Sequence, residues 1–386
     1  MSATEHTPDS PAAEVSADRE LCPLSFAQER LWFLDQLQPG SSAYNISQDW
    51  RLEGDFDLAT FEAALNEVIR RHETLRTTFS RVEGKPVEII SAFQPVTLQV
   101  RDLSGETDPE TAASRFVIAT ANQPFDLQRG PLFRLELLKL SAHEHLVLFT
   151  LHHIISDAWS FEILRRELTE FYRATQTKTE VQLPELPIQY LDYAHWQREQ
   201  ISGETLSRDL DFWRKTLAGE LSRLEIPTDF CSTEGENSAG ESEPFALSAE
   251  LTNALKTLAQ TEGGTLFNVL LAGLNALLHR ITGQSDFIIG SPISGRDQVE
   301  TENLIGLFIN TIALRNQVNG NATFRELLRN VRENTFHALA HSEVPFEEVV
   351  KALQPDRASG QNPLFQIVLA LHGGYPAEWP LGNLRA

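Results

Sequence analysis

The 386-residue chain is 41% hydrophobic and 22% charged, enough apolar sequence to bury a large core arranged as two lobes. Its 32 Lys and Arg against 54 Asp and Glu give a net charge of −22, which argues against nucleic acid and anionic membrane as partners, because both need a basic surface. Two cysteines are too few for a disulfide framework, and the N-terminus lacks the apolar core of a signal peptide. We therefore expect a cytoplasmic protein.

The beginning of the chain changes from tail to helix near residue 21. Residues 1–20, rich in Ser, Ala, Pro and Glu, are expected to be disordered. Ser25, followed three residues later by Gln28, predicts a helix that begins with a capping box. A second helix is predicted over residues 57–71, where apolar residues recur every three or four positions, and an alternating strand starts at Leu75.

The stretch from Glu144 to Ser160 reads E-H-L-V-L-F-T-L-H-H-I-I-S-D-A-W-S, and the rest of the chain is organised around it. Its first half alternates as a buried strand does, so His152 and His153 should point to opposite faces. Only one of them can then reach a given reaction centre. Asp157 follows in a polar turn, and Ser160 is placed to cap an amphipathic helix.

A histidine at the tip of a rigid strand could act as a general base near neutral pH. From the spacing alone, a core histidine bonded to backbone beside a turn aspartate is slightly favoured. A metal site ranks lowest, because only two or three ligands are at hand. Arg71 and Arg76, at the end of the second predicted helix, are solvated arginines or partners for a buried carboxylate, of which Asp157 is the first candidate.

The second half of the chain again alternates helices with strands, as the first half does, but it contains no exact internal repeat of the sequence. Prolines and lost periodicity predict a connector over 179–200, so we place the lobes at 21–178 and 201–386. Residues 231–244 form an acidic low-complexity loop. Further helices and strands alternate after it: helices from Ser248, Thr265 and Thr323, strands within 286–296 and 304–315, and a final short helix and strand. This pattern predicts an α/β protein built as an α+β sandwich.

Seven motifs resemble, in order, the core motifs of the condensation domains of non-ribosomal peptide synthetases, over residues 21–371. They are S-F-A-Q-E-R-L-W-F-L (25–34), R-H-E-T-L-R-T-T-F (71–79), H-H-I-I-S-D-A-W-S (152–160), Y-L-D-Y-A-H-W (190–196), I-G-L-F-I-N-T (305–311), V-P-F-E (344–347) and N-P-L-F-Q (362–366). H-H-x-x-x-D alone is shared by several acyltransferase families. Seven motifs in one order are far more specific.

The resemblance implies two chloramphenicol acetyltransferase-like lobes that form a V-shaped pseudo-dimer with a tunnel between them. Donor and acceptor carrier proteins would deliver thioesters on phosphopantetheine arms from opposite ends. The acceptor α-amine would attack the donor thioester and form an amide. The implied partners are these carriers and an adjacent adenylation domain or module. No bound cofactor and no metal are implied, and we expect a monomer.

The resemblance also assigns roles to residues of the organising stretch. It implies that His153 lies at the midpoint of the tunnel and deprotonates or positions the amine, whereas His152 is structural. Asp157 would pair with Arg71, with Ser160 supporting the same loop, so Asp157→Ala should mainly lose solubility. Further candidates lie in the tunnel or near a carrier: Trp159, Arg76, Ser294 and Asn310.

The sequence departs from the family pattern in two places. Ala158 stands where a glycine often follows the motif aspartate, which slightly narrows the site. The chain ends at Ala386, whereas family members usually continue further, so the second lobe is expected to be incomplete, with an exposed sheet edge.

His152 excludes the cyclising subtype, and the first motif favours an L-configured donor. Two alternatives stay open: a free-standing acyltransferase with a soluble acceptor, and a non-catalytic domain that recruits carriers.

Overall fold

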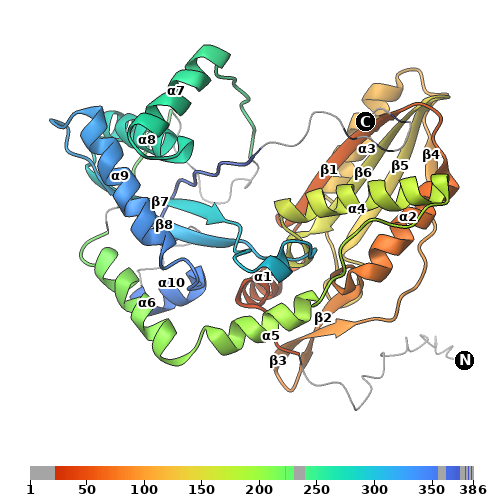
Figure 1. The fold of residues 1–386 in the computed structure, drawn as a ribbon, viewed down its shortest axis with the longest axis horizontal. Coiled ribbons are helices and arrows are strands. Elements are labelled where there is room, and N and C mark those ends of the chain that lie inside the picture. Colours follow the sequence, from red (N-terminus) through yellow and green to blue (C-terminus); the bar gives the residue numbers. More distant parts are fainter. Residues whose placement is uncertain are drawn as a thin grey trace, which may run out of the picture.

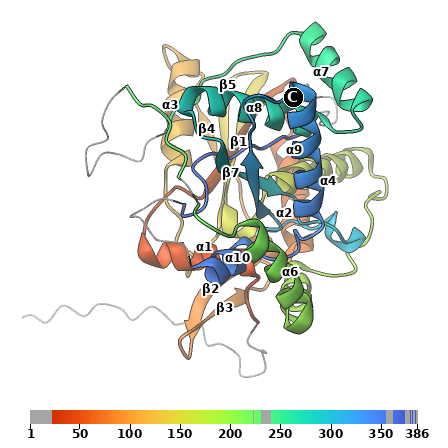
Figure 2. The ribbon, with the colours of Figure 1, turned by 90° about the vertical axis from the view of Figure 1, so that its left-hand side faces the viewer.

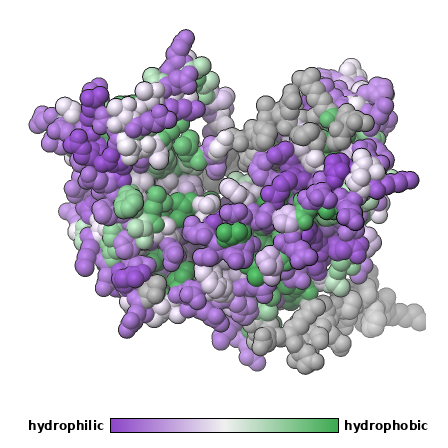
Figure 3. All heavy atoms as spheres, in the orientation of Figure 1, coloured by the Kyte–Doolittle hydropathy of each residue, from purple (hydrophilic) through white to green (hydrophobic). Residues whose placement is uncertain are grey.

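The computed structural model describes residues 22–221, 223–229, 240–354 and 362–373, together with 379, 381 and 384. The predicted tail over 1–20, and most of the acidic loop predicted over 231–244, lie outside the described residues. Figure 1 shows two halves side by side, each with its own sheet, joined below by a helical segment. The molecular surface is hollowed between the two halves (Figure 3). The predicted α/β architecture of two lobes that form a V is confirmed.

The first half contains most of the strands. Its elements are α1 (Phe26–Leu37), β1 (Asn45–Glu53), α2 (Leu58–Arg71), η1 (Glu73–Arg76), β2 (Thr77–Val82), β3 (Lys85–Ile90), β4 (Val100–Asp102), α3 (Pro109–Ala121), β5 (Phe133–Ser141), β6 (Glu144–His152), η2 (His153–Ile155) and α4 (Ala158–Thr177). Four strands form a sheet in the order β1-β6-β5-β4, in which β6 is antiparallel to both of its neighbours. Strands β2 and β3 form a separate antiparallel hairpin.

The central strand β6 is covered on both faces. Val147, Phe149 and Leu151 belong to the main core cluster, which includes buried residues of α2 and α4. Leu146 belongs to a smaller cluster with Ala113 of α3. The alternation read from the sequence is therefore the alternation of the structure.

The second half is mainly helical. Its elements, with the segment that joins the halves, are α5 (Tyr190–Gln200), α6 (Gly203–Thr216), α7 (Ala249–Thr261), α8 (Leu266–Thr282), β7 (Asp286–Ile293), η3 (Val299–Thr301), β8 (Asn310–Gln317), α9 (Phe324–Leu339) and α10 (Phe346–Leu353). β7 and β8 pair antiparallel. Figure 2, turned toward the second half, shows α8 and α9 beside this pair of strands.

Helix starts follow the caps expected from the sequence. Ser25 and Gln28 form a reciprocal capping box at α1, and Thr323 forms one with Glu326 at α9. Ser248 caps α7 and Thr265 caps α8. These are local side-chain to backbone bonds that need no tertiary partner, so the sequence alone is sufficient to predict them.

One of the last two strand predictions is confirmed and the other is wrong. The strand expected within 304–315 is β8, which begins at Asn310, after residues that leave the second half and enter the core of the first. The strand expected after N-P-L-F-Q is reduced to one bridge, in which Val368 pairs in parallel with Gly290. Gly290 lacks the side chain that would collide with the ring of Phe365, so this close approach requires glycine.

Segments distant in sequence complete the core of the first half. Leu304, Ile305, Leu307 and Phe308 belong to its main cluster, as do Tyr190 and Tyr193 of α5. Trp379 also belongs to this cluster, and its ring contacts that of Trp50 at 4.6 Å between centroids. The lobe boundaries drawn from the sequence stay a prediction.

Among the described residues, no single helix is long and apolar enough to cross a membrane. Only α7 and α8 together pass that test of length and composition, and they are bent by 104° at the break between them.

Candidate active site

The two histidines occupy the end of β6 and the turn that follows it. The amide of His152 donates to the carbonyl of Leu132, which keeps it in the sheet. The amide of His153 donates to the carbonyl of Tyr44 at 2.7 Å, and the chain then forms the 3-10 turn η2. The two residues differ in burial: His152 is buried, and His153 is only half-buried. Their expected placement on opposite faces stays a prediction.

His152 is a structural, neutral histidine. Its Nδ1 accepts the amide of Ile154 at 3.1 Å, and the ring lies among Tyr44 and Phe125. Burial, helped by the neighbouring ring of His153, lowers the pKa of His152 to about 4. Because an accepting Nδ1 must be unprotonated, the ring acts as a brace for the turn at neutral pH.

One ring nitrogen of His153 forms a hydrogen bond that fixes the ring, and the other ring nitrogen forms none within the described part of the chain. Its Nδ1 lies 2.6 Å from the carbonyl oxygen of Ser156, a bond in which only the ring nitrogen can donate. The lone pair must then be on Nε2 in the neutral ring. Within the described part of the chain, no residue bonds Nε2. The turn thus presents an imidazole of defined tautomer.

Asp157, rather than Ser160, is the N-cap of α4. Its Oδ1 accepts the amide of Ser160 at 2.9 Å, and the amide of Asp157 donates to Ser160 Oγ in return. The sequence prediction that Ser160 caps the helix is therefore wrong by three residues. Ser160 contributes as the reciprocal member of a capping box.

The expected pair between Asp157 and Arg71 is also wrong, because Asp157 pairs with Arg296. Arg296 Nη2 lies 3.1 Å and 3.2 Å from the two oxygens of Asp157, and both side chains are almost fully buried. The amide of Phe308 donates to Asp157 Oδ2 at 3.2 Å. The loop that carries His153 is thus tied to the second half of the chain.

Arg71 serves a neighbouring buried carboxylate. Arg71 Nε donates to Glu167 of α4 at 3.1 Å, and His72 Nε2 lies 2.8 Å from the other oxygen of Glu167. Burial acts to raise the pKa of Glu167, but the bonds from His72 and Arg71 outweigh it and hold that pKa below its ordinary value. Arg71 therefore braces α2 against α4, at a distance from the motif aspartate.

Arg296 is the partner of Asp157 that the sequence did not reveal. Its Nη1 donates to the carbonyls of Thr301 and Leu304, at 2.5 and 2.8 Å, and its guanidinium stacks on the ring of Phe308 at 4.0 Å. These bonds fold residues 296–308 into a loop that reaches the first half. The available signal was a lone arginine closing the apolar strand D-F-I-I-G-S-P-I-S-G-R.

The loop from the second half is also held at Gly306. Its amide donates to Ser160 Oγ at 3.1 Å, and its carbonyl lies 3.0 Å from the same hydroxyl. A Cβ added at Gly306 would overlap the ring of Tyr190 and lie 2.9 Å from the ring of Phe308. The close packing of this loop against α5 therefore requires glycine at this position.

Gly306→Ala is expected to destabilise the fold by about 1–3 kcal/mol, because overpacking forces rigid neighbours to move. Gly273→Ala is the matched control, since a Cβ on that exposed helical glycine meets nothing within 4 Å. The control should be neutral or stabilising by about 0.5–1 kcal/mol, the difference in helix propensity. Chemical denaturation of both variants measures the contrast, and equal unfolding free energies would refute the close packing.

The other candidates fall in different places. Trp159 is half-exposed beside the turn, and its Nε1 donates to the carbonyl of Glu302 at 3.0 Å. Arg76 donates to the carbonyls of Ile69 and Ser91. Two candidates lie on the strands of the second half or next to them: Ser294, exposed after β7, and Asn310, which starts β8.

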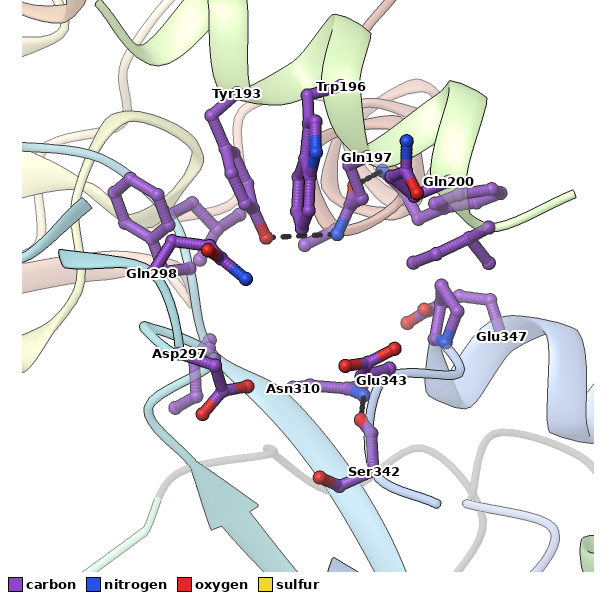
Figure 4. Close-up of a pocket in the computed structure, with 18 residues that line it drawn as sticks. Tyr193, Trp196, Gln197, Gln200, Asp297, Gln298, Asn310, Ser342, Glu343 and Glu347 are labelled. Atoms are coloured by element: carbon purple, nitrogen blue, oxygen red, sulfur yellow. Dashed lines mark hydrogen bonds between the residues drawn. The ribbon is translucent and has the colours of Figure 1, made fainter. Parts of the chain in front are cut away.

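A cavity of about 310 Å³ lies between the halves, and Asn310 is one of its lining residues. Figure 4 shows it bounded by α5, by the loop after β7 and by the start of α10; its labelled polar and aromatic lining residues are Tyr193, Trp196, Gln197, Gln200, Asp297, Gln298, Ser342, Glu343 and Glu347. His153 is not among the lining residues. Phe308 connects the two places, since it is one of the lining residues of the cavity and its amide donates to Asp157.

No group of three or more His, Cys, Asp or Glu side chains that could hold a metal ion occurs within the described ranges.

Two lobes, with the H-H-x-x-x-D turn directly after the central strand of the first, define the chloramphenicol acetyltransferase-like fold class. The chain belongs to the condensation-domain family of the non-ribosomal peptide synthetases, since the family model "Condensation domain" matches residues 18–374. The resemblance read from the seven motifs is thereby confirmed.

Known proteins of two kinds support the assignment. A linear gramicidin synthase of Brevibacillus parabrevis is 44% identical over 363 residues, which are 94% of this chain and 5% of that protein. The first condensation domain of the calcium-dependent antibiotic synthetase, in complex with a substrate analogue, is 25% identical with a TM-score of 0.78, covering 95% and 83% of the two chains. A four-domain non-ribosomal peptide synthetase bound to AMP and glycine is 25% identical with a TM-score of 0.82, covering 95% of this chain and 28% of that one. The chain thus spans only a small part of the curated synthase that it matches.

Proposed function

We propose that this chain forms an amide bond between a donor acyl or peptidyl thioester and the α-amine of an acceptor aminoacyl thioester. Both would be carried on phosphopantetheine arms of partner carrier proteins, within an assembly that includes an adenylation domain or module. Support comes from membership of the family and from relatives that are multidomain synthetases. The observation that carries the proposal is the half-buried ring of His153, with Nδ1 committed to Ser156 and the Nε2 lone pair available.

The proposed reaction needs one proton acceptor and a fixed approach. The amine nitrogen attacks the thioester carbonyl carbon, the C–S bond breaks, and the proton lost by nitrogen ends on the leaving thiol. Nε2 of His153 is placed to accept or hold that amine proton, because Nδ1 keeps its own proton on the carbonyl of Ser156. Asp157 and Arg296 fix the turn without a role in proton transfer, since they pair with each other and bond backbone donors and acceptors.

We propose that one of the two arms reaches the site through the cavity at Asn310, the candidate tunnel residue that lines it. Phe308 lines the cavity and also belongs to the loop that anchors Asp157. A molecule in the cavity would therefore lie next to a residue that holds the turn of His153. Asn310 itself is fixed by bonds from its Nδ2 to the carbonyls of Ser342 and Val344, at 2.8 Å each. We also propose that the protein acts as a cytoplasmic monomer.

The deciding experiment loads two carrier proteins, one with a donor and one with an acceptor amino acid, and follows the product by mass spectrometry. The expected result is dipeptide on the acceptor carrier, formed only with both carriers present. Dipeptide formed equally well with a free amine would favour the free-standing acyltransferase. Carrier binding without product, for every donor and acceptor tried, would favour the recruiting domain.

A further inference from the structure

One wall of the cavity between the halves is the 341–345 turn, which joins α9 to α10. Ser342, Glu343 and Pro345 of this turn line the cavity, and Tyr193 and Trp196 of α5 line the facing wall (Figure 4). A connecting turn lacks the regular backbone bonds of a helix or a sheet, so side chains of neighbouring elements decide its position. The contacts that fix this turn therefore fix one wall of the cavity.

Asn310 holds the later part of the turn from the side of β8. Its Nδ2 donates to the carbonyls of Ser342 and Val344, and its Oδ1 accepts the amide of Phe346 at 3.1 Å. These bonds fix the backbone from Ser342 onward. The beginning of the turn, at His341, is held by a different element.

That element is α6, which packs behind His341. His341 Nδ1 lies 3.0 Å from Asp209 Oδ1, and the ring of His341 stacks on that of Phe212, with 4.0 Å between the centroids and 19° between the planes. The carbonyl of His341 accepts the indole N–H of Trp213 at 2.9 Å. Asp209 lies three residues before Phe212 and four before Trp213, so one face of α6 makes these contacts.

Asp209 is a buried carboxylate with two side-chain partners. Its side chain is 5% exposed, and it accepts from the exposed guanidinium of Arg208 at 2.9 Å as well as from His341. Burial acts to raise the pKa of Asp209, but the bonds from Arg208 and His341 outweigh it and hold that pKa below its ordinary value. Because a carboxylate can only accept, Nδ1 of His341 carries the proton in this bond.

We propose that Asp209 and His341 are positioning residues that hold the 341–345 turn at the distance from α5 that a carrier arm requires. The helix that lines the facing wall, α5, continues into α6 through residues 201–202, so consecutive helices form one wall and hold the other. Loss of the contact lets the turn move without changing the bond between His153 and Ser156. This inference rests on the proposed function, because it takes the cavity as the path of one arm.

The first test compares native protein with Asp209→Ala and Asp211→Ala. Asp211 pairs with Arg214 on the exposed side of the same helix, so its variant is the matched control. Dipeptide formation is measured while the concentration of each loaded carrier is varied in turn. Asp209→Ala should raise KM about tenfold for one carrier, the effect of a lost bond to a charged group. The KM for the other carrier and the rate at saturation should stay near the native values.

This division of the kinetic effect distinguishes positioning from general destabilisation. Loss of folded protein lowers the rate at saturation and leaves KM unchanged, whereas a displaced cavity wall raises the KM of the arm that enters there. An unchanged KM in Asp209→Ala overturns the proposal. A rise shared equally by both carriers, or by Asp211→Ala, overturns it as well.

Two substitutions at His341 separate the hydrogen bond from the ring. Nδ2 of Asn can donate to Asp209 in place of Nδ1, whereas Phe keeps the stack on Phe212 and cannot donate. Arg208 stays beside Asp209 in both variants, so neither leaves the carboxylate without a cation. His341→Asn should keep KM within about twofold of the native value, and His341→Phe should raise it as Asp209→Ala does. The reverse order would overturn the proposal.

Hydrogen exchange followed by mass spectrometry reports on the turn without turnover. The amide of Phe346 donates to Asn310, so it is protected while the turn stays in place. The peptide that contains this amide should exchange about tenfold faster in Asp209→Ala and His341→Phe, and at the native rate in Asp211→Ala. Equal exchange in all four proteins overturns the proposal even if the chain makes dipeptide. Faster exchange in a chain that makes no dipeptide would instead refute the proposed function and show that the contact is structural only.

Discussion

His153→Ala is expected to reduce amide-bond formation by about 10²–10⁴-fold, the range typical of a lost general base or proton-holding group. The fold should survive, because the half-buried ring contributes one hydrogen bond to the turn, from Nδ1 to the carbonyl of Ser156. Loss of that bond costs about 1 kcal/mol. The measurement is a single-turnover assay between loaded carriers, paired with thermal unfolding of the same preparations.

The matched control for this loss is His152→Asn. Asn Oδ1 can accept the amide of Ile154 in place of the ring nitrogen of His152, so the turn keeps its internal bond. Because His152 is buried and its pKa lies at about 4, its removal takes no proton carrier from the reaction at neutral pH. We therefore expect lowered stability with most of the activity retained. Equal loss of rate in the two variants would show that His153 acts only by holding the turn.

The sequence is a good guide to those parts of the fold that depend on local bonds. The capping boxes at Ser25 and Thr323 need only neighbours three residues away, and both form as predicted. The alternation in β6 depends on two covered faces, which a run of apolar residues reports directly. The difference in burial between His152 and His153 arises where β6 ends and the 3-10 turn begins, so strand alternation alone does not account for it.

The parts that failed depend on contacts between distant residues. Asp157 and Arg296 are 139 positions apart, and no periodicity relates the loop over 296–308 to the turn after β6. Arg71 was the natural candidate because it is basic and belongs to one of the motifs. In the structure it pairs instead with Glu167, a buried residue of α4. A buried charge pairs with whichever opposite charge the packing brings close to it. A single sequence does not show which distant residues become neighbours in this way.

The ion pair between Asp157 and Arg296 yields the largest expected effect on stability. Arg296→Met should destabilise the protein by about 3–5 kcal/mol, because it leaves the carboxylate of Asp157 buried without a cation. Asp157→Ala should cost a similar amount, since Arg296 would stay buried with its remaining bonds to the carbonyls of Thr301 and Leu304. Both variants should lose soluble yield, as the lost pair joins the active-site turn to the second half.

A double-mutant cycle distinguishes this pair from the one suggested by the motifs. The Asp157 and Arg296 substitutions should be strongly non-additive in urea unfolding, because removing the second partner of a broken pair costs little more. Asp157 combined with Arg71→Ala should be nearly additive, since Arg71 is bonded to Glu167 and to the carbonyl of Pro184 instead. Strong coupling to Arg71, with none to Arg296, would contradict the structure at this position. Such a result would mean that the loop over 296–308 does not anchor the turn of His153. The second half of the chain would then not hold that ring in place.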